Sequence, residues 1–259
     1  MTELVDRTIV ALRTEHDTVV TLLPNLTDDL LSGPSGAADW SIAQVLSHLG
    51  SSAELGVVPL LAALEGGPAP EVDNRAVWAR WDAAAPVDQA AGYVEHVTRY
   101  VEVVEGLTAA QRSELQVQLS FMPQPLPVST VLGMRLNESA MHGWDVRVGL
   151  DPAAGLMAES AELLATHFAG DLGFLLGFVA KPDQLTEPAR VAAGEVGLVV
   201  DDQARVTGAV ADPTATFEGP LEALVRLLAG RLTPEHTPEG VAVTGNVGLD
   251  DLRRVFPGY

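Results

Sequence analysis

The pattern of apolar residues in the sequence changes at Pro188, and this change limits the folds that the chain can adopt. Before it, apolar residues recur at the three- and four-residue spacing of amphipathic helices, interrupted by glycine and proline. After it, short runs rich in valine and glycine are typical of strands. The sequence therefore predicts an α + (α+β) protein, with a helical bundle over residues 1–182 and a small α+β domain over residues 186–259.

The helical part has its clearest start signal at Ser41 and Gln44, whose spacing is that of a capping box and predicts a helix from Ile42. Pro59 would kink this helix or end it. Ser129 is predicted to cap a later helix, because the alternating prolines of residues 123–127 exclude helix before it. The predicted helices span residues 2–23, 42–65, 87–106, 130–149 and 155–179, and residues 67–86 form a loop or a short helical piece.

The second part alternates strand and helix patterns. Strands are predicted at residues 189–200, 204–210, 214–218 and 241–244, and helices at residues 219–231 and 249–256.

Charge and cysteine content exclude several kinds of function. A net charge of −20 argues against nucleic acid and against an anionic membrane surface, since both require a cationic patch. The absence of cysteine excludes disulfides, thiolate metal ligands and a cysteine nucleophile. Any sulfur chemistry would therefore need a thiol cosubstrate.

The location of the protein is predicted from two further absences. The acidic N-terminus does not resemble a signal peptide. No apolar run approaches the roughly 20 uncharged residues that span a bilayer, and residues 172–180 are the longest candidate. We expect a soluble, cytoplasmic protein, as a monomer or small homo-oligomer.

Glu138 and His142 are the residues whose spacing indicates chemistry. Four residues apart on a helix, they project from the same side about one turn apart, so they could share a divalent metal ion. His48 interrupts an apolar helical run and is the candidate for a third ligand. Asp145 or Asp39 could orient an imidazole. The alternative is that the Glu–His pair is solvated and that His48 is a hydrogen-bonded core residue.

Two imidazoles and one carboxylate suit a catalytic Zn²⁺ ion that keeps a position open for substrate. The same ligand set suits Fe²⁺ or Ni²⁺, so the residues leave the metal undecided.

Two motifs resemble those of a known family. The segment from Asp39-Trp40-Ser41 to His48-Leu49 and the later Glu138-Ser139-Ala140-Met141-His142-Gly143-Trp144-Asp145 are similar to the mycothiol-dependent maleylpyruvate isomerase family. That family belongs to the DinB-like metal-binding four-helix bundles and adds a small domain similar to sterol-carrier proteins. The region from Phe217 to Asn246 resembles that second domain more weakly.

The resemblance implies a fold, a ligand set and a cosubstrate. It implies a DinB-like four-helix bundle followed by a sterol-carrier-like domain, with His48, Glu138 and His142 as ligands of a divalent metal, Zn²⁺ being the first choice. It also implies mycothiol or a similar thiol as cosubstrate. Activated by the metal, that thiol would add to an electrophilic small molecule, which gives cis–trans isomerisation or S-transfer.

Further site residues are predicted by charge. Arg135 and Asp145, on the helix of Glu138, are candidates for catalytic roles, and Arg226 and Arg231 are candidates for binding the thiol cosubstrate. Each arginine could equally be solvated or paired with a carboxylate.

Two other functions fit the same scaffold. One is a binding or resistance protein without turnover. The other is a thiol-independent metal-dependent hydrolase or lyase.

Overall fold

The structure is a computed structural model that describes residues 2–258. The chain forms two compact units, divided between Ala154 and Gly155. The first is mostly helical and the second contains a sheet, as the predicted fold class requires.

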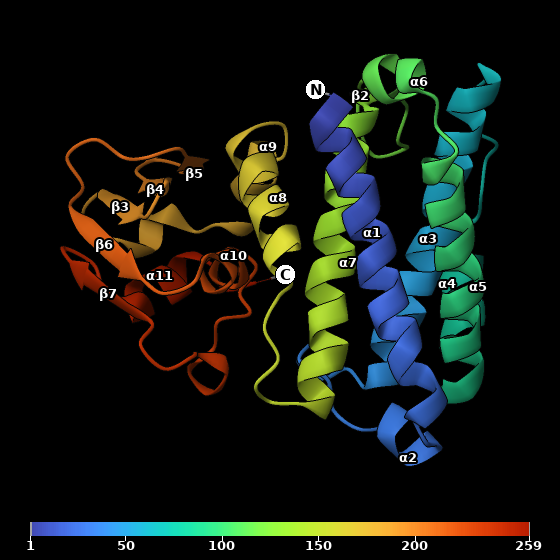
Figure 1. The fold of residues 1–259 in the computed structure, drawn as a ribbon, viewed down its shortest axis with the longest axis horizontal. Coiled ribbons are helices and arrows are strands. Elements are labelled where there is room, and N and C mark those ends of the chain that lie inside the picture. Colours follow the sequence, from blue (N-terminus) through green and yellow to red (C-terminus); the bar gives the residue numbers. More distant parts are fainter. Residues whose placement is uncertain (1, 259) are drawn as a thin grey trace. The chain divides into compact units, whose positions relative to one another are not determined.

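The described part of the N-terminal unit is built on four long helices, shown side by side in Figure 1. They are α1 (Thr2–Leu22), α3 (Ile42–Glu65), α5 (Pro86–Glu105) and α7 (Val128–Leu150). Each packs against two others, α1 on α7 and α5, and α3 on α5 and α7. This closed arrangement is the four-helix bundle that the resemblance implies.

Shorter elements connect the long helices. They are the 3₁₀-helix η1 (Leu23–Asn25), the helices α2 (Asp28–Leu31), α4 (Asn74–Asp82) and α6 (Ala109–Glu114), and the two strands β1 (Gln116–Val117) and β2 (Leu126–Pro127). The strands β1 and β2 pair antiparallel just before α7 begins.

The start of α3 is as predicted and the start of α7 is not. The Ser41 hydroxyl accepts from the Gln44 amide at 3.2 Å, and the Gln44 side chain accepts from the Ser41 amide at 2.8 Å. By contrast, Pro127 occupies the cap position of α7, and the predicted cap residue Ser129 lies inside the helix. The Val128 amide donates to the Leu115 carbonyl instead, so tertiary contacts rather than a side chain start α7. Helix α3 continues through Pro59 to Glu65.

Helix α3 is also the most apolar long helix of the described residues. Its length and a mean hydropathy of 1.3 over an 18-residue window would allow it to cross a membrane, but 56% of that window is buried inside the protein. Burial of this kind is typical of a helix in the core of a bundle. The prediction that residues 172–180 form the longest apolar candidate is therefore wrong.

The C-terminal unit combines helices with a sheet. Its strands are β3 (Ala189–Ala193), β4 (Val196–Val200), β5 (Ala204–Thr207), β6 (Ala215–Glu218) and β7 (Ala242–Gly245). Their order is β5-β4-β3-β6-β7, with β3 and β6 parallel and all other neighbours antiparallel. The helices are α8 (Ala158–Ala169), α9 (Gly173–Val179), α10 (Leu221–Leu228) and α11 (Leu249–Val255), with the 3₁₀-helices η2 (Pro182–Gln184) and η3 (Pro234–His236).

The boundary between the units differs from the predicted one at residues 182–186. The single helix predicted for residues 155–179 is two helices, α8 and α9, bent by 87° at the break between them. Both belong to the C-terminal unit. Helix α8 packs on α10 and β5 and buries Leu163, Leu164 and Phe168, while α9 packs on β5. The sequence reveals that this helix has an apolar face, but it does not reveal which other elements that face packs against.

Candidate metal centre

Helices α3 and α7 bring His48, Glu138 and His142 together. The His48 Nε2 atom lies 2.9 Å from Glu138 Oε2, and His142 Nε2 lies 3.7 Å from the same oxygen. One ligand atom from each residue falls within 4.8 Å of the others. Among residues 2–258, these three residues are the group of histidines and carboxylates whose ligand atoms are close enough together to hold one metal ion.

The packing of α3 on α7 explains the convergence. Leu46 and Leu49 on α3 and Leu136 on α7 are buried, so both helices present apolar faces to the core. Glu138 and His142 occupy one side of α7, one turn apart. The side chains of His48 and Glu138 remain 34% and 31% exposed, whereas that of His142 is 7% exposed. The group is therefore open to solvent on the His48 side.

Asp145 holds His142 from behind. Its Oδ2 atom lies 2.8 Å from His142 Nδ1, and the carboxylate is fully buried. A proton on Nδ1 puts the lone pair on Nε2, the nitrogen nearest Glu138, as metal-ligating histidines require. Asp39, the alternative orienting residue, makes no hydrogen bond to either imidazole within the described residues, and it has a left-handed backbone with a φ of 63°.

Glu138 is held in its charged form. Burial by itself opposes ionisation, but the hydrogen bond with His48 and the nearby charges of His142 and Arg135 outweigh it and lower the pKa of Glu138 to about 2. A charged carboxylate with two imidazole nitrogens fits a divalent cation such as Zn²⁺.

Arg135 lies one turn before Glu138 and is buried, with no ion pair to any residue of 2–258. Its Nη1 donates to Ser52 Oγ at 2.7 Å and its Nη2 to the Leu49 carbonyl at 3.1 Å, while its guanidinium lies 5.2 Å from the Tyr100 ring centre. Its Nε finds no acceptor within the described chain. Burial lowers the pKa of Arg135 from its ordinary value, although Arg remains charged at neutral pH. Arg135 thus places a positive charge behind the His48–Glu138 pair.

The two arginines predicted to bind the thiol are buried in the C-terminal unit. Arg226 is 1% exposed, donates to both carboxylate oxygens of Glu222 at 2.8 and 3.0 Å, and donates to the His236 carbonyl at 2.7 Å. Arg231 is 7% exposed and donates to the Ala229 carbonyl. These contacts support a structural role, which differs from the prediction. Glu222 stands four residues before Arg226, and this spacing was the available signal for the ion pair.

Trp40 is a site residue that the sequence did not single out. Its ring centre lies 5.3 Å from that of His48 and 5.9 Å from that of His142, and it is nearly parallel to the latter ring at 22°. The sequence carries no signal for the position of a loop side chain.

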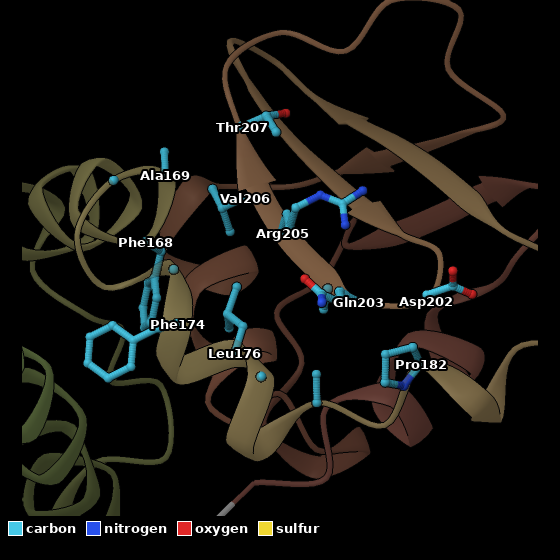
Figure 2. A pocket seen from close by; sticks show the side chains of 15 residues that line it. Phe168, Ala169, Phe174, Leu176, Pro182, Asp202, Gln203, Arg205, Val206 and Thr207 are labelled. Atoms are coloured by element: carbon cyan, nitrogen blue, oxygen red, sulfur yellow. The ribbon is translucent and has the colours of Figure 1, made fainter. Parts of the chain in front are cut away.

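A separate pocket of about 700 Å³ lies in the C-terminal unit (Figure 2). It runs between β5 and the turn from α8 to α9, and its apolar lining includes Phe168, Phe174 and Leu176. Arg205 at its edge is paired with Asp201. Neither Arg226 nor Arg231 lines this pocket.

Comparisons with known proteins agree on one family. A profile of the mycothiol maleylpyruvate isomerase N-terminal domain matches residues 12–147, which is more than half of the chain and includes all three residues of the candidate centre. No curated protein sequence matches the chain significantly.

Two solved structures share the fold. One is the mycothiol-dependent maleylpyruvate isomerase and the other is a histidine-to-alanine mutant of it. Their TM-scores are 0.64 and 0.65, each at 15% identity, covering 93% of this chain and 92% of the other. At this identity the likeness shows the fold, and the profile match shows the family. The chain belongs to the mycothiol maleylpyruvate isomerase N-terminal domain family.

Proposed function

We propose that this protein is a metal-dependent isomerase that uses a low-molecular-weight thiol, mycothiol or a close analogue, to convert a cis alkene conjugated to a carbonyl into its trans isomer. The observation that carries the proposal is the convergence of His48, Glu138 and His142 donor atoms within 4.8 Å, in a member of a family named for this reaction. Zn²⁺ is the first candidate for the ion, and Fe²⁺ or Ni²⁺ suits the same donors.

The chain's own residues would prepare the site. His48 and His142 offer Nε2 and Glu138 offers a charged oxygen, while Asp145 keeps the His142 proton on Nδ1. A divalent ion held by these residues would supply Lewis acidity, which lowers the pKa of a coordinated thiol toward neutral pH.

Isomerisation needs a nucleophile that adds and then leaves. The thiolate sulfur forms a bond to one alkene carbon, and the π electrons move toward the conjugated carbonyl oxygen. The remaining carbon–carbon single bond rotates, and the reverse electron movement expels the thiolate and restores the alkene as its trans isomer. Nothing is oxidised or consumed. Because the chain has no cysteine, the sulfur must come from a cosubstrate.

Arg135 and Asp145, the predicted catalytic residues, are proposed to act by positioning. Arg135 joins α7 to α3 through Ser52 and the carbonyl of Leu49, next to His48, and its charge favours an ionised Glu138 and an anionic substrate. Asp145 fixes the ring of His142. The acidic composition and the thiol cosubstrate suit a cytoplasmic protein, monomeric or a small homo-oligomer, that binds neither nucleic acid nor membrane.

The test is turnover of maleylpyruvate by protein loaded with Zn²⁺, Fe²⁺ or Ni²⁺, with and without mycothiol. We expect the trans product only when metal and thiol are both present, with the thiol fully recovered. Thiol consumed one for one with substrate would instead indicate S-transfer. His142→Ala should abolish turnover and Asp145→Asn should lower it about 10- to 100-fold.

His96→Gln is the matched control, because His96 lies on α5 and is absent from the triad. Turnover without thiol would overturn the proposal in favour of a hydrolase or lyase. Ligand binding without turnover in metal-loaded protein would favour the binding-protein alternative.

A further inference from the structure

Trp40 lies against both histidines of the candidate centre and is still 37% exposed. Its ring is stacked on that of His142 and tilted by 48° to that of His48. His142 is covered, while the neighbouring sides of His48 and Glu138 stay accessible. The indole is therefore positioned at the open side of the site.

The loop that carries Trp40 is fixed to α7. The Trp40 carbonyl accepts from the Ser35 amide at 3.1 Å and from the Ser35 hydroxyl at 2.8 Å. The Gly36 amide donates to the Asp145 carbonyl at 2.8 Å. A Cβ atom on Gly36 would lie 2.5 Å from the Val148 side chain, so only glycine permits this approach. The loop thus holds Trp40 in register with the helix that carries Glu138 and His142.

Two other tryptophans of the N-terminal unit, Trp81 and Trp144, use their indole N–H groups within the protein. Trp81 is 4% exposed and donates to Glu54 at 2.7 Å, and Trp144 is fully buried and donates to the Ala154 carbonyl at 2.7 Å. For Trp40 no protein acceptor occurs among residues 2–258, so its N–H group is available to a ligand.

We propose that Trp40 forms a wall of the substrate site that stacks on a planar, electron-poor, conjugated carboxylic acid and offers its indole N–H to a carboxylate oxygen. This inference rests on the proposed function and adds the residue that selects the substrate class. An electron-rich indole face favours a flat π system that is depleted of electrons, and a saturated acid of equal charge cannot stack in this way.

The test compares fumarate with succinate, which have the same charge and carbon number but differ in the planar double bond. Their dissociation constants would be measured by calorimetry on Zn²⁺-loaded protein, without thiol and without turnover. A contribution of the metal ion to carboxylate binding is common to both acids and cancels in the ratio. We expect fumarate to bind about two- to tenfold more tightly than succinate.

Three variants locate the effect. Trp40→Leu should bring the ratio to one, and Trp40→Phe should retain a preference while weakening both acids through loss of the N–H donor. Trp78→Leu is the matched control, because Trp78 is 48% exposed on α4 and makes no ring contact with the two histidines. It should leave both constants unchanged.

Metal content is measured for each variant, and only protein with one metal equivalent is compared. Equal binding of the two acids by the parent protein would overturn the inference, as would a preference that survives in Trp40→Leu. If Trp40→Leu loses its metal, the inference is tested by the ratio of the two dissociation constants in the parent protein and in Trp40→Phe. An absence of isomerase turnover would leave the ratio intact, so this inference and the proposed function fail separately.

Discussion

Two polar clusters in the same bundle differ in how completely the protein satisfies them. In the first, His16 on α1 lies 2.8 Å from Thr98 and 3.4 Å from Tyr93 on α5, in the interior of the bundle. In the second, His48, Glu138 and His142 converge at an accessible edge. The first cluster uses its polar atoms to join helices. The second directs nitrogen and oxygen lone pairs toward one point, which is the arrangement of a ligand site.

The comparison teaches that burial alone does not indicate function. Next to His16, Glu15 is 1% exposed and accepts from Arg147 at 3.0 Å. Such a closed pair is costly to break from one side. Substitutions in the open cluster should have the opposite consequence. They should change the free energy of unfolding little and reduce metal binding strongly.

The largest expected effect is loss of metal from the open cluster. His48→Ala and His142→Ala should each reduce bound metal from about one equivalent to less than about a tenth, because two ligands rarely retain a divalent ion. Elemental mass spectrometry of untagged protein measures this. The free energy of unfolding, measured on metal-free protein, should change little in either variant. Retention of full metal by both variants would contradict the three-ligand site.

The next effect concerns the closed cluster. Glu15→Gln should lower the free energy of unfolding by about 3 kcal/mol, because it removes the buried carboxylate that neutralises the Arg147 charge. Urea unfolding followed by circular dichroism measures the change, and metal content should remain that of the parent. A variant that kept its stability but lost metal would show that the two clusters are not independent.

The smallest effect is a pH dependence due to His16. Burial lowers the pKa of His16 to about 4, below the ordinary value of 6.5. Between pH 6.5 and pH 4, His16 is protonated in the unfolded chain and neutral in the folded protein. Stability from neutral His16 is thus complete above pH 6.5 and is lost as the pH falls toward 4. The loss is at most about 1.4 kcal/mol per pH unit.

The measurement is urea unfolding at pH 7, 6 and 5 for the parent and His16→Gln. Titrations common to both proteins cancel in the difference, so the parent should lose more stability than the variant on acidification. Parallel curves for the two proteins would mean that His16 binds its proton equally well in the folded and the unfolded chain, which would contradict the prediction.

Local signals predicted much of the fold. The Ser41–Gln44 capping box depends on residues three apart, and the helix begins where this pattern puts it. Ser129 failed as a cap because the start of α7 is determined by β1 and β2, through the bond from the Val128 amide to Leu115. The predicted domain boundary differs from the observed one for a similar reason. The apolar face of α8 shows in the sequence, but α10 and β5, on which it packs, follow later in the chain and cannot be identified from local residues.

The candidate site could be predicted only where spacing or a family motif carried information. The four-residue spacing of Glu138 and His142 put both on one side of α7. His48 was a candidate because it interrupts an apolar helical run, and the resemblance implied the same ligand. Arg226 could not be assigned from charge alone, because its role depends on Glu222 and the His236 carbonyl. Trp40 was missed because its position depends on a loop fixed to another helix.

The unequal exposure of the three donors has a consequence for the exchange of the ion. His142 is covered by Trp40 and fixed by Asp145, whereas His48 and Glu138 are accessible from solvent. A chelator can therefore approach only from the accessible side, and the bond to His142 would be the last to break. For the same reason, an imidazole-acylating reagent should react with His48 before His142 in metal-free protein. In the candidate centre, His48 would thus be the outer ligand that can be exchanged, and His142 the inner ligand that anchors the ion.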